Sequence, residues 1–257
     1  MVALVTESSN IWNAGLCCPD PGILTKFKLL IMKKFLSFLA ILLLFIGIKA
    51  NAQDQIKRED IEWLDVWLPE TNNSGLPRVL LIGNSITRQY FKEVEQHLKG
   101  KAFVGRLSTS KSLGDPGLLK EIELVMGYHH FDVVHFNNGM HGWDYSEEEY
   151  ARAFPWLLRV IRKCAPDAKL IWASTTPIRT GQDMKSFAER NSRVIERNRL
   201  AAEMLKNENV LINDLYSVIE PDPVFYQGGD GVHPAPAGVK VLATQVSNKI
   251  RQALGTE

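Results

Sequence analysis

The fold is decided by the stretch RVLLIGNS, residues 78–85, in which an apolar run ends at a glycine-containing turn. Such a run is typical of a buried β-strand, and a helical pattern follows it to about Leu98. Similar short apolar runs recur at 102–107, 131–137, 168–174 and 209–213. We therefore predict five strands.

Amphipathic helices are predicted between and after these strands. Apolar residues recur three or four positions apart at Tyr150, Phe154, Leu157, Ile161 and Cys164, and again at Val239, Leu242, Val246, Ile250 and Ala253. We expect Pro155 to kink or start the first of these helices. Alternating strands and helices predict a parallel sheet covered on both faces, which binds ligands beyond the carboxyl ends of its strands.

Residues 32–52 have the pattern of an export signal. Lys33 and Lys34 precede an apolar run at 35–48, and Ala50-Asn51-Ala52 fits a signal-peptidase site. The apolar run has 14 residues, fewer than the roughly 20 of a membrane-spanning helix. We therefore expect cleavage near Ala52 and no stable membrane span afterwards.

This reading leaves residues 53–257 as a single exported domain, periplasmic or secreted. Residues 1–31 precede a second methionine that begins a complete signal, so we expect them to be a spurious N-terminal extension. Only Cys164 of the 3 cysteines lies beyond the predicted cleavage site, so no intramolecular disulfide is expected. A net charge of +1 over 257 residues supplies no basic field, and nucleic acid is not the predicted partner.

Ser85 comes directly after the first predicted strand, where the next helix begins. A serine at this junction is either a helix N-cap or a nucleophile assisted by the helix N-terminus. The sequence around Ser85 is not G-x-S-x-G, so the nucleophile elbow of the α/β-hydrolases is absent.

Two further blocks carry polar residues suited to a serine hydrolase. The loop GGDGVHP at 228–234 holds Asp230 and His233, three positions apart, which can form the pair that accepts a proton from serine. The block HFNNGMHG at 135–142 holds Asn137 and Asn138, whose amides can donate to an oxyanion. Alone, the first block is as readily an ordinary turn, and for the second an ordinary turn is the preferred interpretation.

Together the three blocks resemble those of the SGNH hydrolases, the GDSL-type esterase and lipase superfamily, over residues 75–255. The resemblance implies a three-layer α/β/α flavodoxin-like fold with a central, mostly parallel five-stranded sheet, and no cofactor. It also implies that Ser85 is the nucleophile and that Asp230 and His233 complete the catalytic triad.

For the oxyanion hole, the resemblance implies the backbone N–H groups of Ser85 and Gly114 and one asparagine amide. Asn137 is favoured over the alternative Asn138 because Gly139-Met140-x-Gly142 resembles the continuation of this block in esterases. Asn84 stands where the family usually has aspartate, a change that should be tolerated because that side chain is commonly structural.

We expect an exported serine esterase that hydrolyses short acyl groups, chiefly acetyl, on carbohydrate, because export and the absence of a long apolar lid segment favour a glycan ester over a long-chain lipid. Three other interpretations compete with this one. His129, His130, His135 and His141 fall close together, but they form no known ligand motif, and we expect no metal. A non-catalytic carbohydrate-binding protein of the same fold is the second, with Trp63, Trp67 and Trp143 as platforms for sugar rings. A lipase or thioesterase acting on other acyl substrates is the third.

Overall fold

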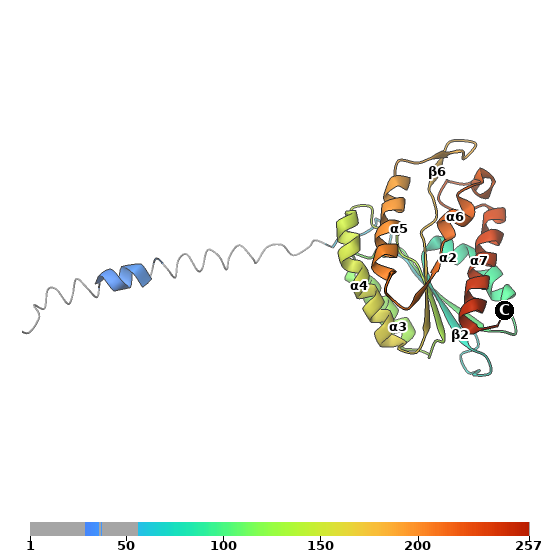
Figure 1. Ribbon diagram of the computed structural model, residues 1–257, viewed down its shortest axis with the longest axis horizontal. Coiled ribbons are helices and arrows are strands. Elements are labelled where there is room, and N and C mark those ends of the chain that lie inside the picture. Colours follow the sequence, from blue (N-terminus) through green and yellow to red (C-terminus); the bar gives the residue numbers. More distant parts are fainter. Residues whose placement is uncertain (1–28, 36, 38–55, 257) are drawn as a thin grey trace, which may run out of the picture. The chain divides into compact units, whose positions relative to one another are not determined.

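A central sheet with six strands organises the chain from Ile56 onward in the computed structural model (Figure 1). The structure describes residues 29–35, 37 and 56–256. The strands lie in the order β1-β3-β2-β4-β5-β8. Their bounds are β1 Leu64–Trp67, β2 Arg78–Gly83, β3 Phe103–Thr109, β4 Val133–Phe136, β5 Lys169–Ala173 and β8 Val210–Asn213.

The five predicted strands correspond to β2, β3, β4, β5 and β8, all parallel to one another, and this prediction is confirmed. The sequence did not reveal β1, which pairs antiparallel with β3 at one edge of the sheet. This strand has four residues and is largely exposed, so it lacks the buried apolar run that marks the others.

Helices cover both faces of the sheet, with α3, α4 and α5 on one side and α2, α6 and α7 on the other (Figure 1). Their bounds are α2 Ser85–His97, α3 Pro116–Met126, α4 Glu147–Cys164, α5 Asn191–Leu205, α6 Leu215–Ile219 and α7 Pro236–Leu254. A 3₁₀ helix, η1, spans Pro223–Tyr226, and β6 (Arg179–Thr180) and β7 (Ser186–Phe187) form a small hairpin. The predicted three-layer α/β/α arrangement is therefore confirmed.

Alternation along the strands divides the core into two layers. On β2, Val79 and Leu81 pack into the layer under α2 and α7, whereas Leu80 and Ile82 pack into the layer under α3 and α4. Because both faces are covered, the strand reads as a continuous apolar run.

Both helices predicted from periodicity are present, as α4 and α7. Pro155, however, lies inside α4 and does not start it. The helix begins at a capping box, in which Ser146 and Glu149 each accept a hydrogen bond from the other's backbone N–H. The start of α4 is therefore fixed by Ser146.

Residues 29–35 are helical and are described separately from the unit that begins at Ile56. Most of the predicted export signal and extension, including the cleavage site near Ala52, lies outside the described residues. No helix among the described residues is long and apolar enough to cross a membrane.

A buried polar network ties β4 to β8 and α7. His135 is fully buried, and its Nε2 accepts a hydrogen bond of 3.1 Å from the Asn213 amide. Asn213 Oδ1 in turn accepts a bond of 3.0 Å from Gln245. Burial lowers the pKa of His135 from 6.5 to about 4, so the folded protein holds this ring neutral.

This network predicts a loss of stability in mild acid. Between about pH 6.5 and pH 4 the unfolded chain binds a proton on His135 that the folded chain excludes. The free energy of unfolding should therefore fall as pH falls through this range, by up to about 1.4 kcal/mol per pH unit for one proton. Urea unfolding at pH 7.0 and pH 5.0 measures the effect, which should shrink in His135→Gln but persist in the control His130→Gln, an exposed site. Equal losses in the parent and in His135→Gln would contradict this account.

Candidate active site

Ser85 lies at the carboxyl end of the central strand β2 and is the first residue of α2. The helix is capped by Asn84, whose Oδ1 accepts a 3.0 Å hydrogen bond from the backbone N–H of Ile86. The prediction of Ser85 as the helix N-cap is therefore wrong, because Asn84 is the N-cap of α2. The Ser85 hydroxyl is left available for another partner.

That partner is His233, from the loop between η1 and α7. Its Nε2 lies 2.8 Å from Ser85 Oγ, and its Nδ1 lies 2.7 Å from Asp230 Oδ2. The structure thus brings together the three residues singled out from the sequence, although 145 positions separate Ser85 from Asp230. The order of contacts is that of a nucleophile, a base and a group that orients the base.

Asp230 is fixed by its own loop. Its Oδ1 accepts hydrogen bonds from the backbone N–H groups of Val232, at 2.9 Å, and His233, at 2.8 Å. Desolvation acts to raise the pKa of Asp230, but these bonds and the contact with the His233 ring outweigh it and lower the pKa to about 2. The carboxylate is therefore ionised at any working pH and holds the imidazole by Nδ1.

The turn between these two residues requires glycine. Gly231 has a φ of +81°, and a Cβ there would lie 1.9 Å from the carbonyl oxygen of Arg179. The close approach lets the Arg179 N–H donate a 2.8 Å hydrogen bond to the Gly231 carbonyl. The Asp230–His233 loop is thereby docked on β6.

The two asparagines predicted as oxyanion donors are engaged elsewhere. Asn137 donates both amide hydrogens, to the Ala173 carbonyl at 2.7 Å and to Thr175 Oγ1 at 3.1 Å. Asn138 donates to the Lys111 carbonyl at 3.0 Å. These bonds fasten the loop after β4 to its neighbouring loops. Both amide hydrogens of Asn137 are therefore engaged, whereas Asn138 donates one of its two.

Gly114 lies in the loop after β3, which flanks β2 on the side opposite β4. A Cβ at this position would come within 2.6 Å of the Tyr145 ring, so glycine permits this loop to pack against the loop after β4. Among the described residues, no acceptor takes the N–H of Gly114 or of Ser85. The role of these two N–H groups as oxyanion donors stays a prediction.

A charged segment at 57–63, not recognised from the sequence, bridges the two loops. Lys57 pairs with Glu149, Arg58 pairs with Asp115, and the Trp63 N–H donates to Ser110 Oγ at 2.9 Å. Glu59 Oε1 accepts a 3.0 Å hydrogen bond from the Gly142 N–H. Long-range ion pairs of this kind leave no periodic pattern, so sequence reasoning has no signal for them.

The histidines of the metal hypothesis do not gather around one point. His135 is buried in the network with Asn213, the exposed His130 lies 3.8 Å from Asp132, and His141 faces Glu59. In the part of the chain that the structure describes, no group of three or more histidine, cysteine or acidic side chains is arranged to hold a metal ion.

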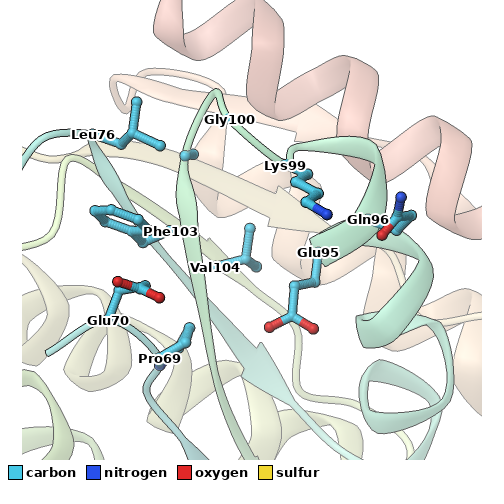
Figure 2. Close-up of a pocket in the computed structure, with 10 residues that line it drawn as sticks. Pro69, Glu70, Leu76, Glu95, Gln96, Lys99, Gly100, Phe103 and Val104 are labelled. Carbon is cyan, nitrogen blue, oxygen red and sulfur yellow. The ribbon is translucent and has the colours of Figure 1, made fainter. Parts of the chain in front are cut away.

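Two of the cavities in the molecule differ in where they lie relative to Ser85. The one in Figure 2, of about 330 Å³, lies where β3 begins, at the end of the sheet opposite Ser85, and is lined by residues such as Phe103 and Lys99. The other, of about 200 Å³, lies between the 57–60 segment and residues 142–144 and includes Trp143. Of these two, the second borders the loop after β4.

Comparison with known proteins identifies the fold. No protein-family model and no curated sequence matches the chain. Among solved structures, a carbohydrate esterase of family 3 from Talaromyces cellulolyticus is 15% identical, with a TM-score of 0.56 over 70% of this chain and 99% of its own. The catalytic domain of a peptidoglycan O-acetyltransferase from Streptococcus pneumoniae is 18% identical, with a TM-score of 0.51 over 70% and 96%.

A protein proposed to be an SGNH hydrolase, from Slackia heliotrinireducens, is 20% identical, with a TM-score of 0.52 over 68% of this chain and 100% of its own. At these identities the likeness concerns the fold. It agrees with the parallel sheet and its helical layers, and it confirms the fold that the three sequence blocks predicted. This chain has the SGNH hydrolase fold.

Proposed function

We propose that this chain is an exported serine esterase that removes short acyl groups, chiefly acetyl, from carbohydrate. The observation that carries the proposal is the line of hydrogen bonds from Ser85 through His233 to Asp230, at 2.8 and 2.7 Å. It stands at the carboxyl edge of a parallel sheet, where such folds bind their ligands.

The geometry supports a two-step acyl transfer. His233 Nε2 takes the Ser85 proton as Oγ attacks the ester carbonyl carbon, and the carbonyl oxygen becomes an oxyanion. The same nitrogen then returns the proton to the leaving alcohol, which leaves an acyl group on Ser85. Water repeats the sequence, releasing the carboxylic acid and restoring the hydroxyl.

The oxyanion has two backbone donors within this proposal. The Ser85 N–H is one of the unpaired groups at the start of α2, where the helix dipole favours negative charge. The Gly114 N–H comes from the loop on the other side of β2. Donors that are already in place stabilise the transition state without reorganisation.

The substrate class is inferred from the cavity of about 200 Å³ that borders the loop after β4. Its lining is dominated by charged side chains, including Lys57, Asp60 and Arg190, and by the Trp143 ring. Such a surface suits a hydroxyl-rich sugar better than a long alkyl chain. Two proteins of similar fold, a carbohydrate esterase and a peptidoglycan O-acetyltransferase, also handle carbohydrate esters according to their names.

Ser85→Ala tests the nucleophile. Because Asn84 provides the helix cap, the substitution should leave the thermal unfolding midpoint within a few degrees of the parent while hydrolysis of 4-nitrophenyl acetate is lost. Acetate release by the parent from acetylated xylan, pectin and peptidoglycan then identifies which carbohydrate forms the alcohol part of the substrate ester. A folded Ser85→Ala variant with full activity would refute the assignment, and a parent that binds glycans but hydrolyses no ester would favour the carbohydrate-binding alternative.

His233→Ala should be comparably inactive, whereas Asp230→Ala should retain more activity because the carboxylate acts only through the imidazole. Activity of the parent should fall in acid, since a histidine base must be unprotonated. Asp230, with a pKa of about 2, stays ionised in mild acid, so the acid limb should report the imidazole. Initial rates of ester hydrolysis from pH 4 to pH 9 provide the measurement. An active His233→Ala variant would rule out the triad.

A further inference from the structure

One ring nitrogen of His141, Nε2, is buried and belongs neither to the Ser85–His233–Asp230 line nor to the hydrogen bonds between the loops. This atom is shielded from solvent and has no hydrogen-bond partner among the described residues. The ring lies edge-on to Trp63, with the ring centroids 6.3 Å apart. An unpaired polar atom at such a place costs free energy in the folded protein, so it calls for a function.

The position of His141 is at the catalytic edge. It follows β4 in the loop that begins at Asn137, whose N–H donates to the Ile82 carbonyl at the end of β2. Burial lowers the pKa of His141, Glu59 counteracts this, and a positive charge on His233 lowers it further. Burial therefore favours the neutral form of this ring.

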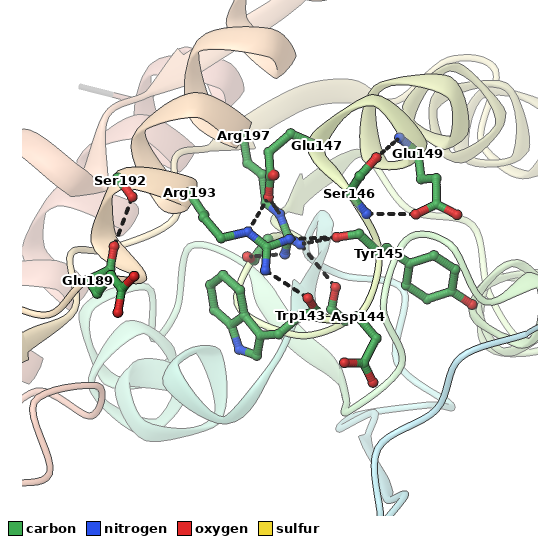
Figure 3. A network of polar contacts seen from close by, with 12 residues as sticks. Trp143, Asp144, Tyr145, Ser146, Glu147, Glu149, Glu189, Ser192, Arg193 and Arg197 are labelled. Atoms are coloured by element: carbon green, nitrogen blue, oxygen red, sulfur yellow. Dashed lines mark hydrogen bonds and ion pairs between the residues drawn. The ribbon is translucent and has the colours of Figure 1, made fainter.

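The loop that carries His141 is held by a buried guanidinium, shown in Figure 3. Arg197 is 1% exposed and donates to the carbonyl oxygens of Gly139, His141, Gly142 and Tyr145, at 2.9 to 3.2 Å. Its Nε lies 3.3 Å from Glu147, and its guanidinium lies over the Trp143 ring. Four carbonyl contacts from one side chain fix the path of the loop, as a preorganised site requires.

We propose that the Nε2–H of His141 is the side-chain donor to the oxyanion, in the role that the sequence suggested for Asn137 or Asn138. The inference rests on the proposed esterase function and deepens it. It accounts for two observations together, the engagement of both Asn137 amide hydrogens by Ala173 and Thr175 and the unpaired Nε2 of His141.

The proton position is compatible with this role. Glu59 Oε1 lies 3.4 Å from His141 Nδ1, longer than a normal hydrogen bond, and already accepts from the Gly142 N–H at 3.0 Å. Glu59 therefore holds the Nδ1 proton only weakly. The role requires the neutral tautomer that already carries its proton on Nε2 and leaves Nδ1 unprotonated opposite Glu59. The hydrogen bond from Nε2–H then strengthens as the ester oxygen becomes negative in the transition state.

The test compares His141→Asn with His141→Leu, two side chains of similar shape of which only the amide carries N–H donors. In His141→Leu, kcat for 4-nitrophenyl acetate should fall about a hundredfold or more, with KM changed less than about threefold, as when one oxyanion donor is removed. His141→Asn should regain at least about tenfold in kcat over the leucine variant. His130→Leu, at an exposed position, is the matched control and should behave like the parent.

Thermal unfolding of each variant separates folding from catalysis, and His141→Ala is a second donor-free variant if His141→Leu fails to fold. If a folded donor-free variant keeps kcat within about threefold of the parent, His141 is not the donor, and the esterase proposal stands on Ser85. If His141→Asn is as slow as His141→Leu, the N–H group is not what matters, and the inference is overturned. A parent that hydrolyses no ester overturns both.

Discussion

The parallel pairing of β2 with β3 on one side and β4 on the other is the constraint on which the rest of the site depends. It brings the carboxyl ends of the three strands to one edge, so that Ser85 lies between the loop after β3 and the loop after β4. Those loops carry Gly114 and His141, the proposed oxyanion donors. The loop before α7 then has only to present His233 to the serine. Because β2, β3 and β4 run in the same direction, the residues that follow them lie at the same edge of the sheet although they are far apart in sequence.

Much of this arrangement could be predicted from the sequence because its signals are local. Each of the five buried strands is marked in the sequence by an apolar run. Asp230 and His233 are three positions apart, so a single turn can hold both. Ser85 is marked by its position at a strand-to-helix junction. Asn84 was also correctly expected to be structural, and its side chain caps α2.

The proposed side-chain donor to the oxyanion, His141, could not be predicted from the sequence, because the choice depends on contacts between loops. The sequence shows two adjacent asparagines after β4, but only the folded chain reveals that Ala173, Thr175 and Lys111 supply acceptors for their amides. The sequence does contain one indication of the role of Arg197. This arginine lies on the buried face of α5 with Val194 and Ala201, where an apolar residue is expected. A cation on such a face needs many acceptors, and the loop of His141 supplies them.

The central claim is that Ser85 is an activated nucleophile, and covalent labelling tests it most directly. A fluorophosphonate reacts with a serine whose proton is removed by a neighbouring base and forms a stable adduct on that oxygen. Peptide mass spectrometry of the labelled parent should find one adduct, on the peptide that contains Ser85, and labelling should be lost in His233→Ala. An unlabelled protein, or an adduct on any other residue, would contradict the account.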